Sequence, residues 1–502
     1  MRPAAARPTS STGAPDVSNF GSILSIARTA ISAHQTALQT VSHNLANAET
    51  EGYSRQRAEL VARWPQAFPF GNVGTGATVS NVIRLRSEHL DNSYRREIGT
   101  RDAFLLRHDV LAEAEQVLAE PSDNGLSTTL DQFWNAWSDL SNAPSSPAAQ
   151  SVVRQRGIQL ATSLNSYATR LADLSTRTRS RLGETVAEIN VLAGQLGDLN
   201  RQITSAEVGG LQAPDLRDAR DRIADRLAQI AGARTEIQAN GTMAVYIRST
   251  MLVDATNART LELRGGTTVS LGLKGDPDPL VGVTGPLQAM VDVINVDLPA
   301  LTARLDGFAR GLVNGVNEYH RSGWTAAGDA LGGSNWNPVN GPTGSMVDFF
   351  DPAWTTAGGI RLSAAVTTSA TVIASGDAQN AAGNNNVALA LSALRDDSGM
   401  AALQTRMGAN FATAIGFATG ESYIDHHAQT VSGLGVSVAD ASHQHEVYDT
   451  LTKQADNRRA SVAGVSIDEE LTLLMRHQQA YAAATKLVQT ADEMAAAILA
   501  MV

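Results

Sequence analysis

The sequence predicts a mainly α-helical, multi-domain α+β protein, in which terminal helices form a coiled-coil core, a long helical bundle follows, and a central β-rich domain is inserted. Three observations predict this fold class. Apolar residues recur at alternating spacings of three and four near both ends of the chain, which is typical of coiled-coil helices. Longer helical patterns lie between the ends. Near the middle, apolar and polar residues alternate, as they do in strands.

The composition excludes several classes of protein. The 502 residues include 39 basic and 50 acidic side chains, giving a formal charge of −11, and no cysteine. Binding to nucleic acid or to an anionic membrane needs clustered Lys and Arg, and no basic run occurs, so we expect neither partner. Without cysteine the chain has no disulfide, thiolate zinc site or cysteine nucleophile. No stretch reaches the roughly 18 apolar residues of a transmembrane helix.

The N-terminal region begins with a polar segment. Residues 1–19 are rich in Pro, Ser, Thr and Ala and lack the apolar core of a Sec signal peptide, so we expect a disordered leader. Residues 20–56 are predicted to form the N-terminal coiled-coil helix of the core. The predicted inter-subunit residues of this helix are Leu24, Ile31, Leu38, Val41 and Leu45.

The C-terminal region, 458–502, is predicted to form the second coiled-coil helix. Ser466 followed by Glu469 is a capping box, and it marks the start of the helix. The helix carries apolar residues on more than one side, so it is able to pack on two sides. Its predicted inter-subunit residues are Leu471, Leu474, Tyr481, Leu487, Ala491, Met494 and Ile498.

The middle of the chain is predicted to contain a helical bundle and the β-rich domain. The bundle is expected to comprise 57–233, 285–322 and 387–457, with one long rod-like helix within 160–203. The β-rich domain is expected at 234–284. There, Asn240 and Gly241 between two alternating runs predict a hairpin with a type I′ turn. The Gly- and Asn-rich stretch 323–386 is predicted to be loop and strand of the same domain.

The narrow apolar stripes of the terminal helices leave two interpretations. The stripes bury themselves against other chains, in which case the protein is a polymer subunit whose terminal helices become ordered on assembly. Alternatively, the two termini pair with each other inside one monomeric bundle. Periodicity alone favours neither.

Catalytic signatures are weak. His443, His445 and Glu446 come close to a zinc-protease motif, but Asp449 stands where the second metal-binding histidine belongs. The sequence lacks a P-loop and a Gly-x-Ser-x-Gly elbow. Asp276 and its neighbouring carboxylate alternate with prolines, which predicts a solvated loop. We therefore expect that the protein is not an enzyme and has no catalytic, cofactor-binding or metal-binding residues. A secreted metallohydrolase remains the less favoured alternative.

Two motifs resemble those of the bacterial flagellar rod, hook and hook-associated proteins, the axial proteins of the flagellum. The first follows the N-terminal helix, and its Tyr-Ser-Arg-Gln ending is most similar to the junction proteins of that family. The second opens the C-terminal helix. Two features depart from the family: His477 stands where an aromatic residue is frequent, and about 18 residues precede the usual start. The residues that carry the resemblance are Asn44, Asn47, Thr50, Gly52, Tyr53, Arg55, Gln56, Asp468, Glu469 and Gln479.

The resemblance implies a secreted structural subunit that is exported through the flagellar type III apparatus and assembles as a ring at the hook tip, joining hook to filament. The implied partners are the flagellar hook protein, hook-associated protein 3, a flagellar secretion chaperone and further copies of the chain, without any cofactor. Another rod or hook component, and a coiled-coil adhesin or chaperone-like module, remain alternatives.

Overall fold

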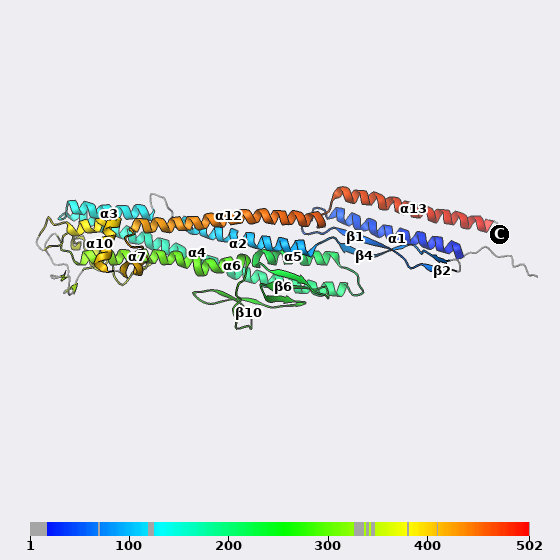
Figure 1. Ribbon diagram of the computed structural model, residues 1–502, viewed down its shortest axis with the longest axis horizontal. Helices are drawn as coiled ribbons and strands as arrows, with labels where there is room; N and C mark the ends of the chain where they lie inside the picture. Colours follow the sequence, from blue (N-terminus) through cyan, green and yellow to red (C-terminus); the bar gives the residue numbers. More distant parts are fainter. Residues whose placement is uncertain are drawn as a thin grey trace, which may run out of the picture.

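The computed structural model describes residues 18–68, 71–118, 125–325, 336–337, 341–342, 347–378, 381–408 and 410–500. The expectation of a leader at 1–19 therefore falls almost entirely outside the described residues. The molecule is elongated (Figure 1), with both terminal helices at one end, a long bundle of helices, and strands at the side of the bundle. The fold is mainly helical with inserted strands, as the sequence predicts.

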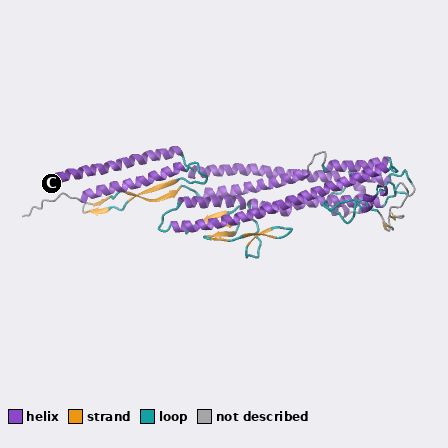
Figure 2. Ribbon diagram, turned by 180° about the vertical axis from the view of Figure 1, so that it is seen from behind, coloured by secondary structure: helices purple, strands orange, loops and turns teal. Residues whose placement is uncertain are grey.

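One end of the molecule, the terminal segment, consists of two helices and a β-ribbon. Helix α1 (Ser18–Ala46) packs against α13 (Ile467–Ala500). The ribbon pairs β1 (Gln56–Ala62) with β4 (Ala77–Arg84) in antiparallel register, and it continues into the short hairpin of β2 (Gln66–Phe68) and β3 (Gly71–Val73). Both ribbon views place α1 between α13 and this ribbon (Figures 1 and 2).

The rod of the molecule is built from long helices. They are α2 (Glu88–Leu118), α4 (Pro147–Ala206), α5 (Pro214–Ala231) and α12 (Tyr423–Ala463). The long helix expected within 160–203 is α4, which has 60 residues. Ser146 caps α4 by accepting a hydrogen bond from Ala149 N, and Pro147 occupies its first turn, where the missing N–H costs nothing.

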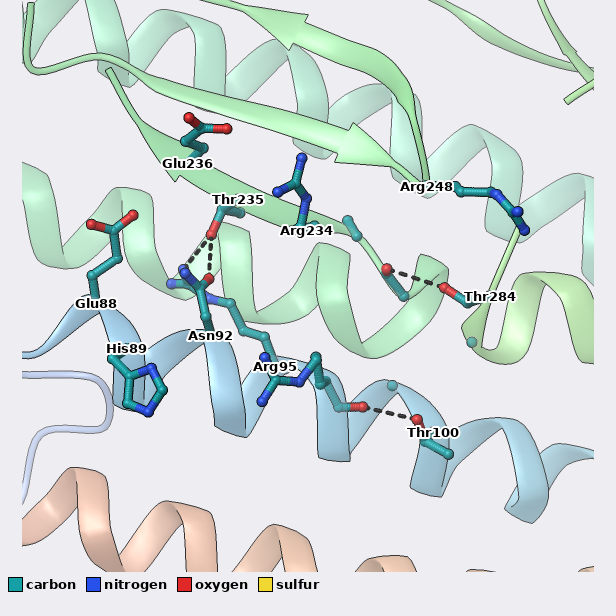
Figure 3. Close-up of a pocket in the computed structure, with 15 residues that line it drawn as sticks. Glu88, His89, Asn92, Arg95, Thr100, Arg234, Thr235, Glu236, Arg248 and Thr284 are labelled. Carbon is teal, nitrogen blue, oxygen red and sulfur yellow. Dashed lines mark hydrogen bonds between the residues drawn. The ribbon is translucent and has the colours of Figure 1, made fainter. Parts of the chain in front are cut away.

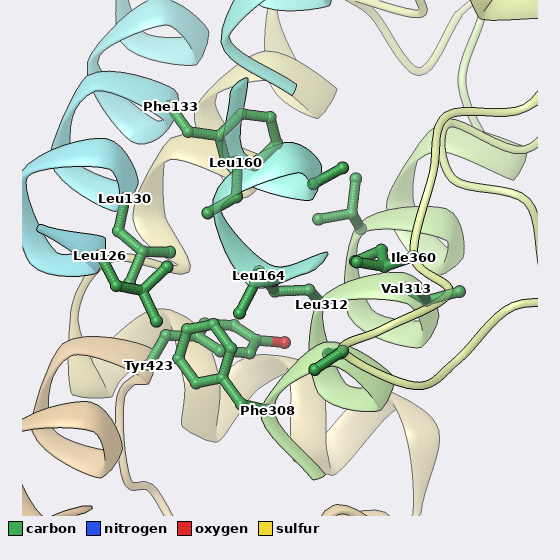
Figure 4. Packing of buried hydrophobic residues seen from close by; sticks show 14 of the residues in the cluster. Leu126, Leu130, Phe133, Leu160, Leu164, Phe308, Leu312, Val313, Ile360 and Tyr423 are labelled. Carbon is green, nitrogen blue, oxygen red and sulfur yellow. The ribbon is translucent and has the colours of Figure 1, made fainter. Parts of the chain in front are cut away.

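The far end, the head, is a compact helical core (Figure 4). Aromatic residues from α3, α7, the start of α12 and the loop at 349–350 pack together there. Helix α6 runs through a π-helical turn (Val293–Asp297) directly into α7, so Pro299 does not break the chain's helical course. Helix α6 (Gly285–Asp292) packs against α2 and α5 in the rod. The helical elements of the head are α3 (Leu126–Asn142), α7 (Leu298–Arg321), α8 (Ala364–Thr368), a 3₁₀ turn (Ala370–Val372), α9 (Asn386–Ala393), α10 (Asp397–Met407) and α11 (Asn410–Ile415).

The β-rich region lies between α5 and α6 and packs against α4. Its sheet has the order β5-β6-β7-β8 with antiparallel neighbours, and β9 pairs with β10 in a separate hairpin. A further two-residue pair, β11 (Trp336–Asn337) and β12 (Gly341–Pro342), follows α7. The strands are β5 (Arg234–Ile237), β6 (Met243–Ile247), β7 (Thr250–Asp254), β8 (Asn257–Ala258), β9 (Leu261–Arg264) and β10 (Ser270–Leu273).

The hairpin of β5 and β6 has the predicted strands but a different turn. Gln238 N donates to Thr242 O at 2.8 Å, and Gly241 N donates to Gln238 O at 2.9 Å. Only Gly241 has a positive φ, of 81°, whereas a type I′ turn needs two such residues. Because Gln238 pairs with Thr242, three residues, 239–241, form the connection. It is a three-residue loop that ends in a glycine bulge at Gly241.

Three segments differ from the sequence-based assignment. The start of 57–233 is the ribbon rather than bundle, because its strands gain stability from α1 and show little alternation of their own. Part of 323–386 belongs to the head: Phe349 and Phe350 are fully buried there, and Asn317 of α7 exchanges two hydrogen bonds with the Phe350 backbone. Finally, the segment 458–502 includes the end of α12, which continues to Ala463, while the C-terminal helix itself begins at Ile467, directly after the predicted cap Ser466.

Candidate assembly interface

Small side chains line the contact between α1 and α13. Ala27 and Ala37 of α1 are buried, as are Ala484 and Ala491 of α13. Alanine allows two helix backbones to approach closely, but each alanine buries little apolar area. The terminal helices are therefore ordered and paired within one chain, as the monomeric interpretation expects, but through a seam of modest hydrophobic content.

The predicted inter-subunit residues divide into three groups. Val41 and Ala491 are buried in the seam between α1 and α13. Leu471, Leu487 and Met494 are exposed on α13, while the side chain of Ile498 lies outside the described residues. Part of the predicted surface is thus used within the chain, and part is left facing solvent. The remaining members are half-buried: Leu24, Ile31, Leu38, Leu45, Leu474 and Tyr481.

The N-terminal motif closes on itself around the buried side chain of Asn44. Its Nδ2 donates to Gln56 O at 2.8 Å and to Glu470 Oε2 at 3.0 Å. Its Oδ1 accepts from Gln56 N at 2.9 Å and from the Tyr53 hydroxyl at 2.8 Å. One amide therefore joins the end of α1, the start of β1 and the first turn of α13. Burial, together with Asp215, Asp218 and Glu470, raises the pKa of Tyr53, so its hydroxyl stays a donor.

Arg55 and Glu470 complete this arrangement, which we call the clasp. Arg55 Nε donates to Glu470 Oε1 at 2.7 Å, and its Nη1 donates to Glu469 Oε2 at 2.7 Å. The Glu470 side chain is only 1% exposed, so its charge depends on Arg55 and Asn44 for compensation. The backbone N of Arg55 also donates to Ala463 O at 2.8 Å, which fixes the link between α12 and α13.

A charged network next to the clasp joins the terminal segment to the rod. Asp218 of α5 accepts from Ser54 Oγ at 2.7 Å and from Arg84 Nη1 at 2.7 Å. Burial alone would raise the pKa of Asp221, but Arg86, Arg84 and Arg95 together hold it well below its ordinary value. Asp218 and Asp221 both lie on α5, and both bind Arg84 of β4. These contacts fix the position of the ribbon relative to the rod.

The other motif residues have local roles or lie apart from the clasp. Gly52 has a φ of 74°, as the sequence predicts for a chain reversal, and a Cβ there would meet Arg222 Cγ at 2.5 Å. Asn47 Nδ2 donates to His43 O at 2.9 Å, and Asn47 Oδ1 accepts from the Thr50 hydroxyl at 3.3 Å. Ser466 caps α13 weakly, with Glu469 N donating to its Oγ at 3.5 Å. Asp468 and Gln479 are exposed.

Several members of this site were missing from the sequence prediction. Glu470 was not among the predicted site residues, and its burial was not foreseen. Ser54, Arg84 and Asp218 were not singled out at all, because their partners are distant in sequence. The Tyr-Ser-Arg-Gln run that carries the resemblance contained Ser54, and three polar residues in a row after a helix were a usable signal for buried contacts.

The two histidines of the seam, His34 and His477, face each other with their Nδ1 atoms 3.3 Å apart. His477 is the residue that departs from the family pattern. Burial, followed by the His34 and Arg476 charges, lowers the pKa of His477. The two ring nitrogens are within hydrogen-bonding distance, and the rings lie with their centroids 5.5 Å apart.

A cavity of about 580 Å³ lies between α2 and the beginning of the β-rich region (Figure 3). Glu88 and Glu236 lie toward one end, Arg248 lies toward the other, and Arg234 lies between them. Arg95 is committed to α5, since its Nε donates to Asp225 Oδ1 at 2.6 Å. The lining thus combines opposite charges and groups that already hold the rod together, and we assign no catalysis to it.

The histidine motif lies on α12, in the rod. Asp449 is engaged by Lys453 at 2.7 Å and lies 3.8 Å from Arg101, so it pairs with cations rather than completing a ligand set. His445 Nδ1 lies 3.4 Å from the backbone oxygen of Arg101. Within the described ranges no group of three His, Asp or Glu side chains is arranged to hold a metal ion.

Family models of flagellar proteins match the middle and both ends of this chain. A family model for the helical domain of flagellar hook-associated protein FlgK matches residues 111–335. Models for the flagellar basal body rod protein and for the C-terminal region of the basal body rod proteins FlgEFG match residues 24–53 and 459–501. The two terminal matches cover most of α1, all of α13, and Asn44, Tyr53, Glu469 and Glu470 of the clasp, but not Arg55.

Curated relatives match along nearly the whole chain. Flagellar hook-associated protein 1 of Bacillus subtilis is 29% identical over 94% of this chain and 96% of its own length. The protein of the same name from Escherichia coli is 24% identical over 94% and 98%. The solved structure of the flagellar hook junction protein FlgK from Burkholderia pseudomallei covers 75% of this chain and 100% of its own, with a TM-score of 0.58 and 14% identity, which shows a shared fold.

The resemblance to the flagellar axial proteins is therefore confirmed, and it is specifically to hook-associated protein 1. These matches support a structural role in the axial part of the bacterial flagellum, and the curated relatives are themselves named as hook-associated proteins. No described helix is long and apolar enough to span a membrane.

Proposed function

We propose that this chain, which is similar to flagellar hook-associated protein 1 from its first helix to its last, joins the hook to the filament as a ring of subunits at the hook tip. The observation that carries the proposal is the two-sided α13. Ala484 and Ala491 are buried against α1, whereas Leu471, Leu487 and Met494 remain exposed. A monomer gains nothing from exposed Leu and Met side chains, while a subunit buries them on assembly.

The terminal segment is suited to this role because polar contacts hold it in a fixed shape while several of its apolar side chains stay exposed. The clasp and the α5 network fix the direction in which α1 and α13 leave the rod. The apolar residues that are left exposed then supply the binding energy between subunits. In this proposal the hook protein contacts the terminal segment from below, and hook-associated protein 3 binds on the opposite side.

The proposal also includes secretion of the chain and a secretion chaperone. The chain is exported through the flagellar type III apparatus, and a secretion chaperone covers α13 beforehand. The exposed Leu487 and Met494 are the surface that such a chaperone would shield. The proposed role is structural and needs no catalytic residue, cofactor or metal.

Deletion of the gene tests the proposal. Electron microscopy should show hooks without filaments, and filament protein should accumulate in the culture medium. Normal filaments on the deletion strain would contradict the flagellar role. Missing hooks would assign the chain to the rod or hook instead of the junction.

A further inference from the structure

The β-ribbon presents a tryptophan almost wholly to solvent. Trp64 is 92% exposed, and the neighbouring Leu60 and Val61 are also exposed. The backbone here is held firmly: Arg63 N donates to Gly76 O at 2.9 Å, and Thr75 Oγ1 donates to Trp64 O at 2.7 Å. Trp64 is therefore displayed by a fixed backbone, in the way that aromatic anchors of protein interfaces are.

The ribbon is also fixed against α1. Gly76 has a φ of 98°, and a Cβ at this position would overlap the Thr29 hydroxyl and lie 3.3 Å from Ile26 Cα. Only glycine fits this close approach of the turn to the helix. The position of Trp64 relative to the terminal helices is consequently set by backbone contacts.

A second exposed apolar face lies on α13. Ile467, Leu471 and Met475 are 49%, 41% and 55% exposed. They are spaced four residues apart, so they lie along one side of the helix. Because α1 is between α13 and the ribbon, this face and Trp64 belong to the two outer layers of a three-layered segment (Figures 1 and 2). They do not meet within one chain.

We propose that the ribbon of one copy, through Trp64 and Leu60, docks on the Ile467, Leu471 and Met475 face of α13 in a second copy of this chain. The inference rests on the proposed ring assembly and names the surfaces that build it. The contact is heterologous, because each copy offers one surface on either side of α1. A heterologous contact repeats from copy to copy, and it closes into a ring when the rotation allows.

Charge complementarity favours a second copy as the occupant. Arg57 and Arg63 are exposed on the ribbon beside the apolar residues, and Asp468 is exposed beside Ile467 and Leu471. In the described part of the chain none of these charged groups takes part in a salt bridge. Docking the ribbon on α13 brings basic groups to an acidic one and apolar groups to apolar ones.

Disulfide cross-linking tests the contact directly, since the chain has no cysteine of its own. The double variant Trp64→Cys/Met475→Cys replaces two exposed residues and leaves the buried core unchanged. It is expressed in place of the wild-type gene, and hooks are isolated and oxidised. A ladder of cross-linked dimers and higher species is expected. The control Trp64→Cys/Val191→Cys places the second thiol on an exposed site of α4 and should stay monomeric.

Each outcome has a defined meaning. If the variant is present at hook tips but remains monomeric on oxidation, the docking contact is wrong while the proposed function stands. Cross-links to a different protein overturn the second copy as occupant. If the wild-type protein is absent from hook tips, the proposed function itself fails.

A charge exchange provides an independent check. Arg63→Glu should reduce the number of hooks bearing filaments about tenfold, and adding Asp468→Arg should restore a large part of it. Unfolding of the purified variants should match that of the wild type, because both side chains are exposed. A double variant as defective as the single one would contradict the pairing.

Discussion

The head and the terminal segment bury their side chains in opposite ways. The head encloses large aromatic residues: Phe133, Trp134, Trp137 and Phe349 are all buried, with ring centroids of Phe133 and Trp134 4.9 Å apart. The seam of the terminal segment is made mostly of alanines, with Val41, the His34–His477 pair and the polar clasp. The head therefore has a core that is complete within one chain, whereas the terminal segment is held in shape by polar contacts and leaves Leu471, Leu487 and Met494 of α13 exposed.

Among the substitutions that test this comparison, the largest expected effect is on the stability of the head. Trp137→Ala removes a fully buried indole that contacts Phe133 and Phe349, and should cost about 3–5 kcal/mol of the free energy of unfolding of the head. Urea unfolding followed by the near-UV signal of the remaining buried Trp134 measures it. Amide exchange in α13 should stay unchanged. Equal loss of protection there would mean that the two regions unfold as one.

Acid should weaken the head through His320. The imidazole is fully buried. Its Nδ1 donates to Val347 O at 2.9 Å, and its Nε2 accepts from Ala374 N at 3.2 Å. Because one ring nitrogen donates and the other accepts, the ring is neutral. Burial lowers its pKa to about 4. Its stabilising contribution is thus complete above pH 6.5 and is lost as the pH falls toward 4, to a total of roughly 3 kcal/mol.

Urea unfolding at pH 7.5, 5.5 and 4.5 measures this pH dependence. His320→Asn should be less stable than the wild type at neutral pH, yet it should lose less stability between pH 6.5 and 4. His443→Gln on α12 is the matched control and should keep the slope of the wild type. An unchanged slope in His320→Asn would show that other groups in the head cause the acid effect.

The clasp should respond to Arg55→Ala by a smaller amount. The substitution leaves Glu470 buried with Asn44 as its remaining donor, and should weaken the pairing of α1 with α13 by about 2 kcal/mol. Faster amide exchange throughout α13, with unchanged exchange in α4, is the expected readout. Arg63→Ala removes an exposed arginine of the same ribbon and should leave exchange as it is. If both variants behave alike, the clasp does not fix α13.

The sequence predicted the parts of the fold that have a regular pattern. The long helix α4, the strands of the first β hairpin and the start of α13 were all evident from periodicity and capping residues. The ribbon was assigned to the helical bundle because β1 and β4 are stabilised by α1 and a bulge at Glu59 and Leu60 disturbs their alternation. The head contribution of Phe349 and Phe350 was missed because this aromatic pair lies in a stretch whose glycines and asparagines otherwise predict loop.

The site was predictable only in part, for a related reason. Asn44, Tyr53, Arg55 and Gln56 were identified through the family motif, but periodicity cannot reveal that Asn44 reaches Glu470, 426 residues away. The predicted seam also treated all apolar positions of α13 alike. The structure separates them, because alanines pack against α1 while Leu487 and Met494 do not. Long-range polar pairing and the choice between two apolar faces depend on how the whole segment packs.

The smallest expected effect on stability gives the sharpest distinction between folding and assembly. Leu487→Gln replaces an exposed leucine of α13 and should change the free energy of unfolding by no more than about 0.5 kcal/mol. It should nevertheless reduce the fraction of hooks that bear filaments, counted by electron microscopy, because it removes apolar area that assembly buries. Val191→Gln on α4, equally exposed, should do neither. If Leu487→Gln instead destabilises the monomer, this face packs within the chain, and the two-sided α13 loses its role as the source of binding energy.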